Sequence, residues 1–155
     1  MSRIVVIGVG NPYRRDDGVG PAVVRMLRRR ALHGVVLEES DGEPTRLLDL
    51  WGDASLAMVV DAVSARSPRP GRVHRRSLRH PSLRGVGTAS SHGIDLGDAV
   101  ALGEALDRLP ATLLLYAVEA ADTSFGEGLS PAVAAAARAL ADEIATDLLH
   151  RRAVL

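Results

Sequence analysis

Residues 4–20 read IVVIGVGNPYRRDDGVG, and this stretch decides how the rest of the chain is interpreted. It starts with a β-branched apolar run over residues 4–7, which is typical of a strand buried on both faces of a parallel sheet. A helix is predicted from Val19, because apolar residues then follow at helical spacing. A glycine-rich loop with two adjacent acids, Asp16 and Asp17, therefore joins a strand to a helix. In chains that alternate strands and helices, ligands usually bind at such turns.

Apolar runs and helical periodicities alternate along the remaining chain. Further strands are expected at residues 34–37, 56–60, 72–78 and 111–118, and further helices through Trp51, over 96–109 and from 131 to about 148. The arginine-bearing strand at 72–78 is expected at an edge, and residues 80–92, which lack periodicity, are expected to form a long loop. The order predicts one α/β domain over residues 1–155, a three-layer α/β/α arrangement with a mostly parallel, twisted sheet of about five strands.

The composition excludes several classes of site. The chain has 155 residues, of which 46% are apolar, and its 19 arginines balance 19 acids, so its net charge gives no general attraction to nucleic acid or membranes. It contains no cysteine and no lysine, which excludes a thiolate zinc site, a cysteine nucleophile, a Schiff-base lysine and a P-loop.

No signal peptide and no apolar run of about 18 residues is found, so a cytoplasmic protein is expected.

Three candidate functional residues are expected at one edge of the sheet. Asp17 follows the first strand with Asp16, Asp61 ends the third strand, and His92 ends the long loop just before a helix. Two carboxylates and an imidazole suit a divalent transition metal. Each residue also has a structural alternative. One acid of the pair can cap the helix, and we expect Asp16 to play that part. Asp61 can accept hydrogen bonds from loop amides, and His92 can be an ordinary loop histidine. Their joint placement favours the metal site.

Other chemistries fit less well. Gly8 and Gly10 match the start of a dinucleotide-binding fingerprint, but Tyr13 occupies the third glycine position and the acidic pair would repel a pyrophosphate. A nucleotide-binding α/β protein is therefore a weaker hypothesis than the two functions based on a metal that are described below. No G-x-S-x-G nucleophile elbow is present.

Taken together, these motifs resemble those of the nickel-iron hydrogenase maturation proteases. The resemblance rests on Gly8-x-Gly10-Asn11, Asp16-Asp17-Gly18-Val19-Gly20, Asp61-Ala62, Ser91-His92-Gly93 and Gly128-Leu129-Ser130-Pro131, in this order. It covers nearly the whole chain.

The resemblance implies an endopeptidase that removes a C-terminal extension from a hydrogenase large-subunit precursor after nickel insertion. It implies that Asp17, Asp61 and His92 contact the nickel, that the substrate supplies this metal, and that no organic cofactor takes part. A monomer without nucleic-acid or membrane partners is expected. Many members have glutamate where this chain has Asp17, which is shorter by one methylene, so either the loop lies closer or Asp16 shares the role. The segment around Glu119 departs from the family pattern, so Glu119 is assigned no role.

Without cysteine or a serine elbow, water is the simplest nucleophile for peptide cleavage. A metal can polarise the carbonyl or activate the water, or a carboxylate such as Asp17 or Asp61 can act as base, and the sequence does not decide between these routes. The alternative function is a non-catalytic module that senses or escorts a metallated partner protein.

Overall fold

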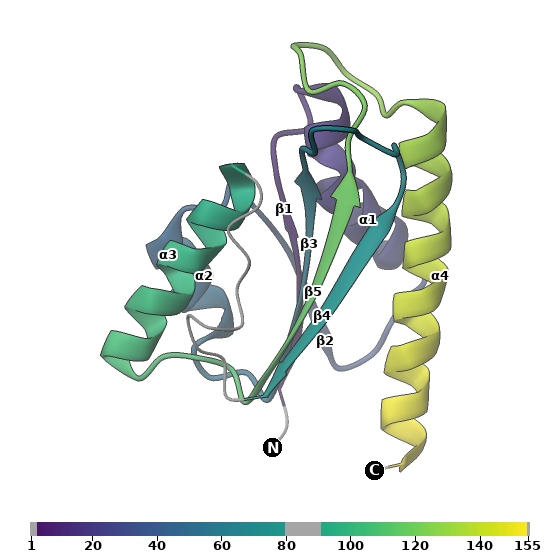
Figure 1. Cartoon of the computed structure of the whole chain (residues 1–155). Coiled ribbons are helices and arrows are strands. Elements are labelled where there is room, and N and C mark those ends of the chain that lie inside the picture. Colours follow the sequence, from purple (N-terminus) through teal and green to yellow (C-terminus); the bar gives the residue numbers. More distant parts are fainter. Residues whose placement is uncertain (1–2, 80–90, 155) are drawn as a thin grey trace.

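The computed structural model describes residues 3–79 and 91–154. These residues form an α/β domain around one five-stranded sheet of order β2-β1-β3-β5-β4 (Figure 1). Four strands run parallel: β1 (Ile4–Val9), β2 (Val35–Ser40), β3 (Leu56–Val63) and β5 (Thr112–Glu119). The last, β4 (Val73–Arg79), is antiparallel to β5 at the sheet edge, which confirms the expected edge strand. The predicted α/β fold with a mostly parallel sheet of about five strands is confirmed.

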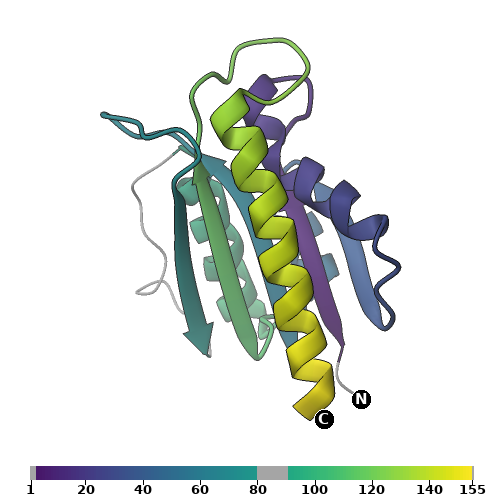
Figure 2. The ribbon, with the colours of Figure 1, turned by 90° about the vertical axis from the view of Figure 1, so that its right-hand side faces the viewer.

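Helices cover both faces of the sheet. One face carries α1 (Val19–Arg28) and α4 (Pro131–Val154), which lie next to each other in Figure 2. The other carries α2 (Pro44–Trp51) and α3 (Ser91–Leu106). No helix in the described ranges is long and apolar enough to cross a membrane.

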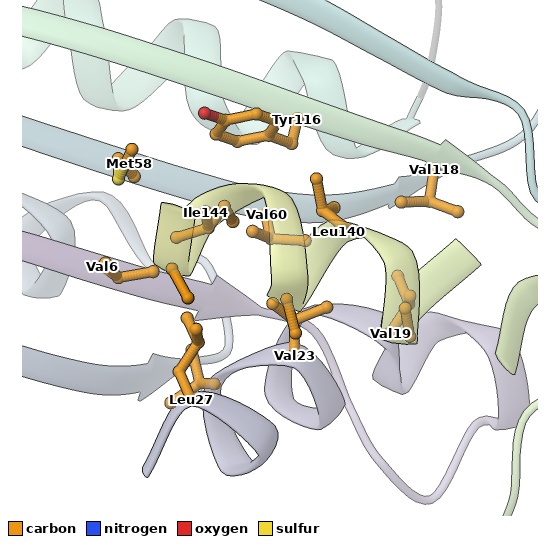
Figure 3. Packing of buried hydrophobic residues seen from close by; sticks show 14 of the residues in the cluster. Val6, Val19, Val23, Leu27, Met58, Val60, Tyr116, Val118, Leu140 and Ile144 are labelled. Carbon is orange, nitrogen blue, oxygen red and sulfur yellow. The ribbon is translucent and has the colours of Figure 1, made fainter. Parts of the chain in front are cut away.

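The core consists of two apolar clusters, one on each face, because successive side chains of a strand point to opposite faces. In the cluster shown in Figure 3, strand residues such as Val60 and Tyr116 pack against Val23 of α1 and Ile144 of α4. The second cluster joins Val59 and its neighbours to the buried faces of α2 and α3, including the fully buried Trp51.

Two boundaries differ from the sequence predictions at the site. The third strand was expected to end at Asp61, but β3 continues to Val63 because its last residues pair with β5, where Val63 lies opposite Glu119. The long loop was expected to include His92, but α3 already begins at Ser91. Gly93 is tolerated there because the first helical turn has few intrahelical hydrogen bonds to lose. The rest of the predicted loop, residues 80–90, lies outside the described residues.

Candidate functional site

The carboxyl ends of β1, β3 and β5 lie at one edge of the sheet, and the predicted site residues belong to elements at that edge (Figure 1). Asp17 lies in η1 (Arg15–Gly18), a 3-10 turn between β1 and α1, and is only 5% exposed. Asp61 lies near the end of β3 and is partly exposed. Both η1 and α3 contact β3. The turn with Asp17 and the helix with His92 therefore pack against the strand that carries Asp61.

The loop before Asp17 is held by Asn11. The Asn11 backbone N–H donates to Asp17 Oδ2 at 2.8 Å, which orients that carboxylate. The Asn11 side-chain oxygen accepts a hydrogen bond from Tyr13 N at 2.9 Å, and its carbonyl oxygen accepts one from Arg14 N at 3.0 Å. These bonds form an Asx-type turn, so Asn11 holds this part of the loop in place.

Glycines let backbone segments of this motif touch one another. Gly10 has φ of 140°, and a Cβ there would lie 1.9 Å from the carbonyl oxygen of Asp17. A Cβ on Gly20 would lie 2.4 Å from the carbonyl oxygen of Val60, so the start of α1 can rest directly on β3. The glycine spacing therefore places Asp17 against the sheet edge.

Asp16 has a structural role, as expected, but with different partners. It was expected to cap the helix, yet α1 has no side-chain cap. Asp16 is fully buried, and its carboxylate accepts hydrogen bonds from the backbone N–H groups of Ala121, Asp122 and Ser130 at 2.7 to 3.0 Å. The Ser130 hydroxyl also donates to this carboxylate, at 2.9 Å from Asp16 Oδ2. Asp16 thus fastens the loop of Asp17 to the loop between β5 and α4. A carboxylate held in this way is not available to share the role of Asp17.

Asp61 faces the layer formed by α2 and α3. Val59, two residues earlier, belongs to the apolar cluster on that side, and residues two apart in a strand share a face. One carboxylate oxygen of Asp61 accepts a hydrogen bond from Ala62 N at 2.7 Å. In register it lies opposite Ala117 of β5, whose small side chain leaves room beside it.

His92 lies in the first turn of α3, the helix that covers the face toward which Asp61 points, but its side chain lies outside the described residues. In Figure 1 the first turn of α3 lies level with the carboxyl edge of the sheet. Among the described residues, no three histidine, aspartate or glutamate side chains group as metal ligands. The metal site of Asp17, Asp61 and His92 stays a prediction.

Glu119 and His74 form a pair that the sequence did not reveal. Glu119 is 3% exposed; its Oε1 accepts from Arg69 N at 3.0 Å, and its Oε2 lies 2.7 Å from His74 Nε2. The Arg69 amide, the hydrogen bond with His74 and the charges of His74 and Arg72 hold the pKa of Glu119 below its ordinary value, although burial opposes them. Glu119 thereby anchors the loop before β4. In the sequence, the only feature that could have pointed to Glu119 was its position at the carboxyl end of a predicted strand, like that of Asp61.

Comparison with known proteins identifies the family. The family model described as hydrogenase maturation protease matches residues 22–147. The chain belongs to the hydrogenase maturation protease family. The matched range includes Asp61 and His92 and begins after Asp17.

Relatives within the hydrogenase maturation protease family span different lengths. The hydrogenase expression/formation protein HupD of Thiocapsa roseopersicina is 30% identical over 134 residues, covering 84% of this chain and 60% of HupD. The chain thus spans three fifths of that relative. The hydrogenase 2 maturation protease of Escherichia coli (strain K12) is 28% identical over 138 residues, covering 86% of this chain and 82% of that protein.

Solved structures of hydrogenase maturation proteases share the fold. The hydrogenase maturating endopeptidase HybD from E. coli superposes with a TM-score of 0.82 at 22% identity, over 96% of this chain and 93% of HybD. The α/β/α arrangement described above is therefore that of the family.

Proposed function

We propose that this chain is an endopeptidase that removes a C-terminal extension from a nickel-loaded hydrogenase large-subunit precursor. The observation that supports the proposal most directly is the placement of Asp17 and Asp61 on contacting elements, η1 and β3, at the carboxyl edge of the sheet in a member of this family. We assign residues 1–155 to one domain of this kind, acting as a monomer on a protein substrate.

In this proposal the nickel arrives as part of the substrate. The carboxylates of Asp17 and Asp61 and the imidazole of His92 offer oxygen and nitrogen ligands, a set that suits a divalent transition metal. The Asn11 N–H keeps Asp17 Oδ2 in place by one hydrogen bond. Asp61 is partly exposed and therefore accessible from outside, as recognition of a metal carried by another protein requires.

Cleavage is a hydrolysis. Water adds across the peptide bond, the carbonyl carbon becomes the new carboxyl terminus of the large subunit, and the nitrogen leaves as the amine of the released extension. The chain has no cysteine to act as nucleophile. The water is activated either by the substrate's metal or by a carboxylate base, Asp17 or Asp61.

The test is incubation of the purified chain with a nickel-loaded precursor, followed by mass spectrometry of the large subunit. We expect one cut near the precursor's C-terminus, and loss of at least about 100-fold in rate in the Asp17→Asn, Asp61→Asn and His92→Ala variants. The matched control is Asp53→Asn, an exposed aspartate whose side chain pairs with Arg3 away from the edge. An unchanged precursor mass with the wild-type chain would instead indicate a metal-sensing escort, and full activity in the three variants would refute the assigned site.

A further inference from the structure

Two exposed aromatic residues belong to loop tips whose backbones are hydrogen-bonded to each other, one of them in the loop that carries Asp17. The chain has four aromatic residues. Trp51 and Tyr116 are buried, whereas Tyr13 is 63% exposed and Phe125 is 83% exposed. Tyr13 belongs to the same loop as Asp17, and Phe125 belongs to the loop between β5 and α4 that Asp16 fastens to it. Residues separated by more than 100 positions are thus brought to one place.

Backbone hydrogen bonds hold these two loop tips rigidly side by side. Gly126 N donates to the carbonyl oxygen of Tyr13, and Arg15 N donates to the carbonyl oxygen of Gly126, both at 2.9 Å. Gly126 has φ of 145°, a backbone conformation that residues with a side chain rarely adopt, so glycine suits the point where the two tips meet.

Arg14 completes the arrangement. Its Nε donates to the carbonyl oxygen of Thr123 at 3.1 Å, and its guanidinium lies 5.6 Å from the centroid of the Phe125 ring. This cation–π contact holds an otherwise exposed ring in position. Tyr13, Arg14 and Phe125 together are called the loop-tip surface below.

A recess opens next to the loop-tip surface. It has a volume of about 330 Å³ and is lined on one side by Pro12, Tyr13 and Arg15, and on the other by residues 127–129 and the start of α1. Aromatic and arginine side chains beside a recess are the residue types that dominate binding energy in protein interfaces. Because hydrogen bonds already join the two loop backbones that carry them, little backbone entropy of these loops is lost when a partner binds.

We propose that the loop-tip surface docks the folded body of the precursor protein whose tail enters the site, an inference that rests on the proposed function. A tail can reach Asp17 and Asp61 only if the protein that carries it rests against the surface around this edge, and Figure 1 shows the loop between β5 and α4 projecting beyond the sheet on that side. The partner's docking area is an apolar depression, which receives Phe125 and Tyr13.

The charges near the tips support an apolar contact. Arg15 pairs with Asp122 at 3.7 Å, and Arg25, which also lines the recess, pairs with Glu39 at 3.0 Å. Glu127 lines the recess as well, so acids balance the arginines there. We therefore expect the affinity for the precursor to change less than about threefold between low and physiological salt.

The experiment measures cleavage of the precursor by the Tyr13→Ala/Phe125→Ala double variant over a range of precursor concentrations. We expect KM to rise at least about tenfold while kcat at saturation stays within about twofold of wild type, because the side chains bind the partner without touching the cleaved bond. The matched controls are Leu106→Ala and Leu149→Ala, which remove exposed leucines elsewhere on the surface and should leave KM unchanged.

A second measurement keeps the test independent of turnover. A photo-crosslinking residue placed at position 125 should capture the precursor, and one placed at position 106 should not. If the wild-type chain cleaves the precursor and the double variant has the same KM, the docking surface is refuted while the proposed function stands. If the wild-type chain does not cleave, the proposed function fails, and capture of the precursor from position 125 still decides the docking surface.

Discussion

Asp16 and Asp17 are adjacent and both buried, yet their carboxylates have different partners. Asp16 accepts hydrogen bonds from three backbone N–H groups of the loop between β5 and α4, whereas Asp17 Oδ2 accepts one from Asn11 in its own loop. The sequence placed both acids at a helix start, and it assigned Asp16 the structural part and Asp17 the site before any family resemblance was considered. The partners of Asp16 lie more than 100 residues away, and local sequence patterns do not contain such contacts.

Replacement of Asp16 should be more damaging to stability than replacement of any exposed acid. We expect Asp16→Ala to lower the free energy of unfolding by about 3 to 5 kcal/mol, because the N–H groups of Ala121, Asp122 and Ser130 lose the fully buried carboxylate that accepts their hydrogen bonds. Urea denaturation followed by circular dichroism measures the change, with the exposed Asp53→Ala as the control. A loss below about 1 kcal/mol would contradict the structural role.

At the scale of helices and strands, the patterns of apolar residues were sufficient to find the strands and α-helices of the described residues, but not the 3-10 turn η1 or where the elements at the site begin or end. The strand at 56–60 was predicted from its apolar run, and the polar Asp61 was interpreted as its end. In the structure β3 continues to Val63, because pairing with β5 supplies hydrogen bonds whatever the side chain. Asp61 is therefore fixed by strand geometry on both sides, which suits a residue that must hold a precise position.

The contact between β5 and α4 should weaken at high pH. Burial in this contact, with Asp147 and Glu143 nearby, raises the pKa of Tyr116 from 10.0 to about 12, although Arg151 and Arg75 oppose the shift. A raised pKa means that the folded chain holds the phenol proton more tightly than the unfolded chain. This contribution to stability is fully present below pH 10 and is lost as the pH rises toward 12.

Between about pH 9 and about pH 11 we therefore expect the wild-type chain to lose about 1 kcal/mol more unfolding free energy than Tyr116→Phe, which has no ionisable group. Urea titrations of both proteins at each pH measure the difference. Parallel losses in the two proteins would show that Tyr116 does not titrate in this contact.

On the scale of the whole molecule, the neutral net charge conceals a strong separation of charge. Residues 62–94 contain seven of the 19 arginines and none of the 19 acids, so the rest of the chain is correspondingly acidic. The described arginines of this segment lie in the loop at 64–72 and in the edge strand β4, both at one side of the sheet. The sequence predicted the edge strand and the α/β class. It did not predict the strand order, because the order depends on pairing between strands that are far apart in the sequence, and no local pattern specifies that pairing.

Charge separation in a neutral protein favours attraction between copies when salt is low. At neutral pH we expect the apparent mass in light scattering to rise with protein concentration in about 10 mM salt and to stay constant in about 300 mM salt, because the Debye length falls well below the size of the molecule. An Arg66→Glu/Arg69→Glu variant, changed at two exposed positions, should lose most of this effect. Identical behaviour at both salt concentrations would contradict the prediction.

The hydrogen bonds that Asp16 makes to the loop between β5 and α4 also affect the order in which the chain folds during synthesis. During synthesis β1 and the loop with Asp16 and Asp17 are made first, but their anchor, which includes Ser130, is separated from Asp16 by 114 positions. Until those positions have been added, the nascent chain holds an acidic loop whose eventual partners do not yet exist, and this part of the fold closes only after β5 has been made. The edge that we propose to process other proteins at the end of their maturation therefore cannot itself form until the chain has been extended through Ser130.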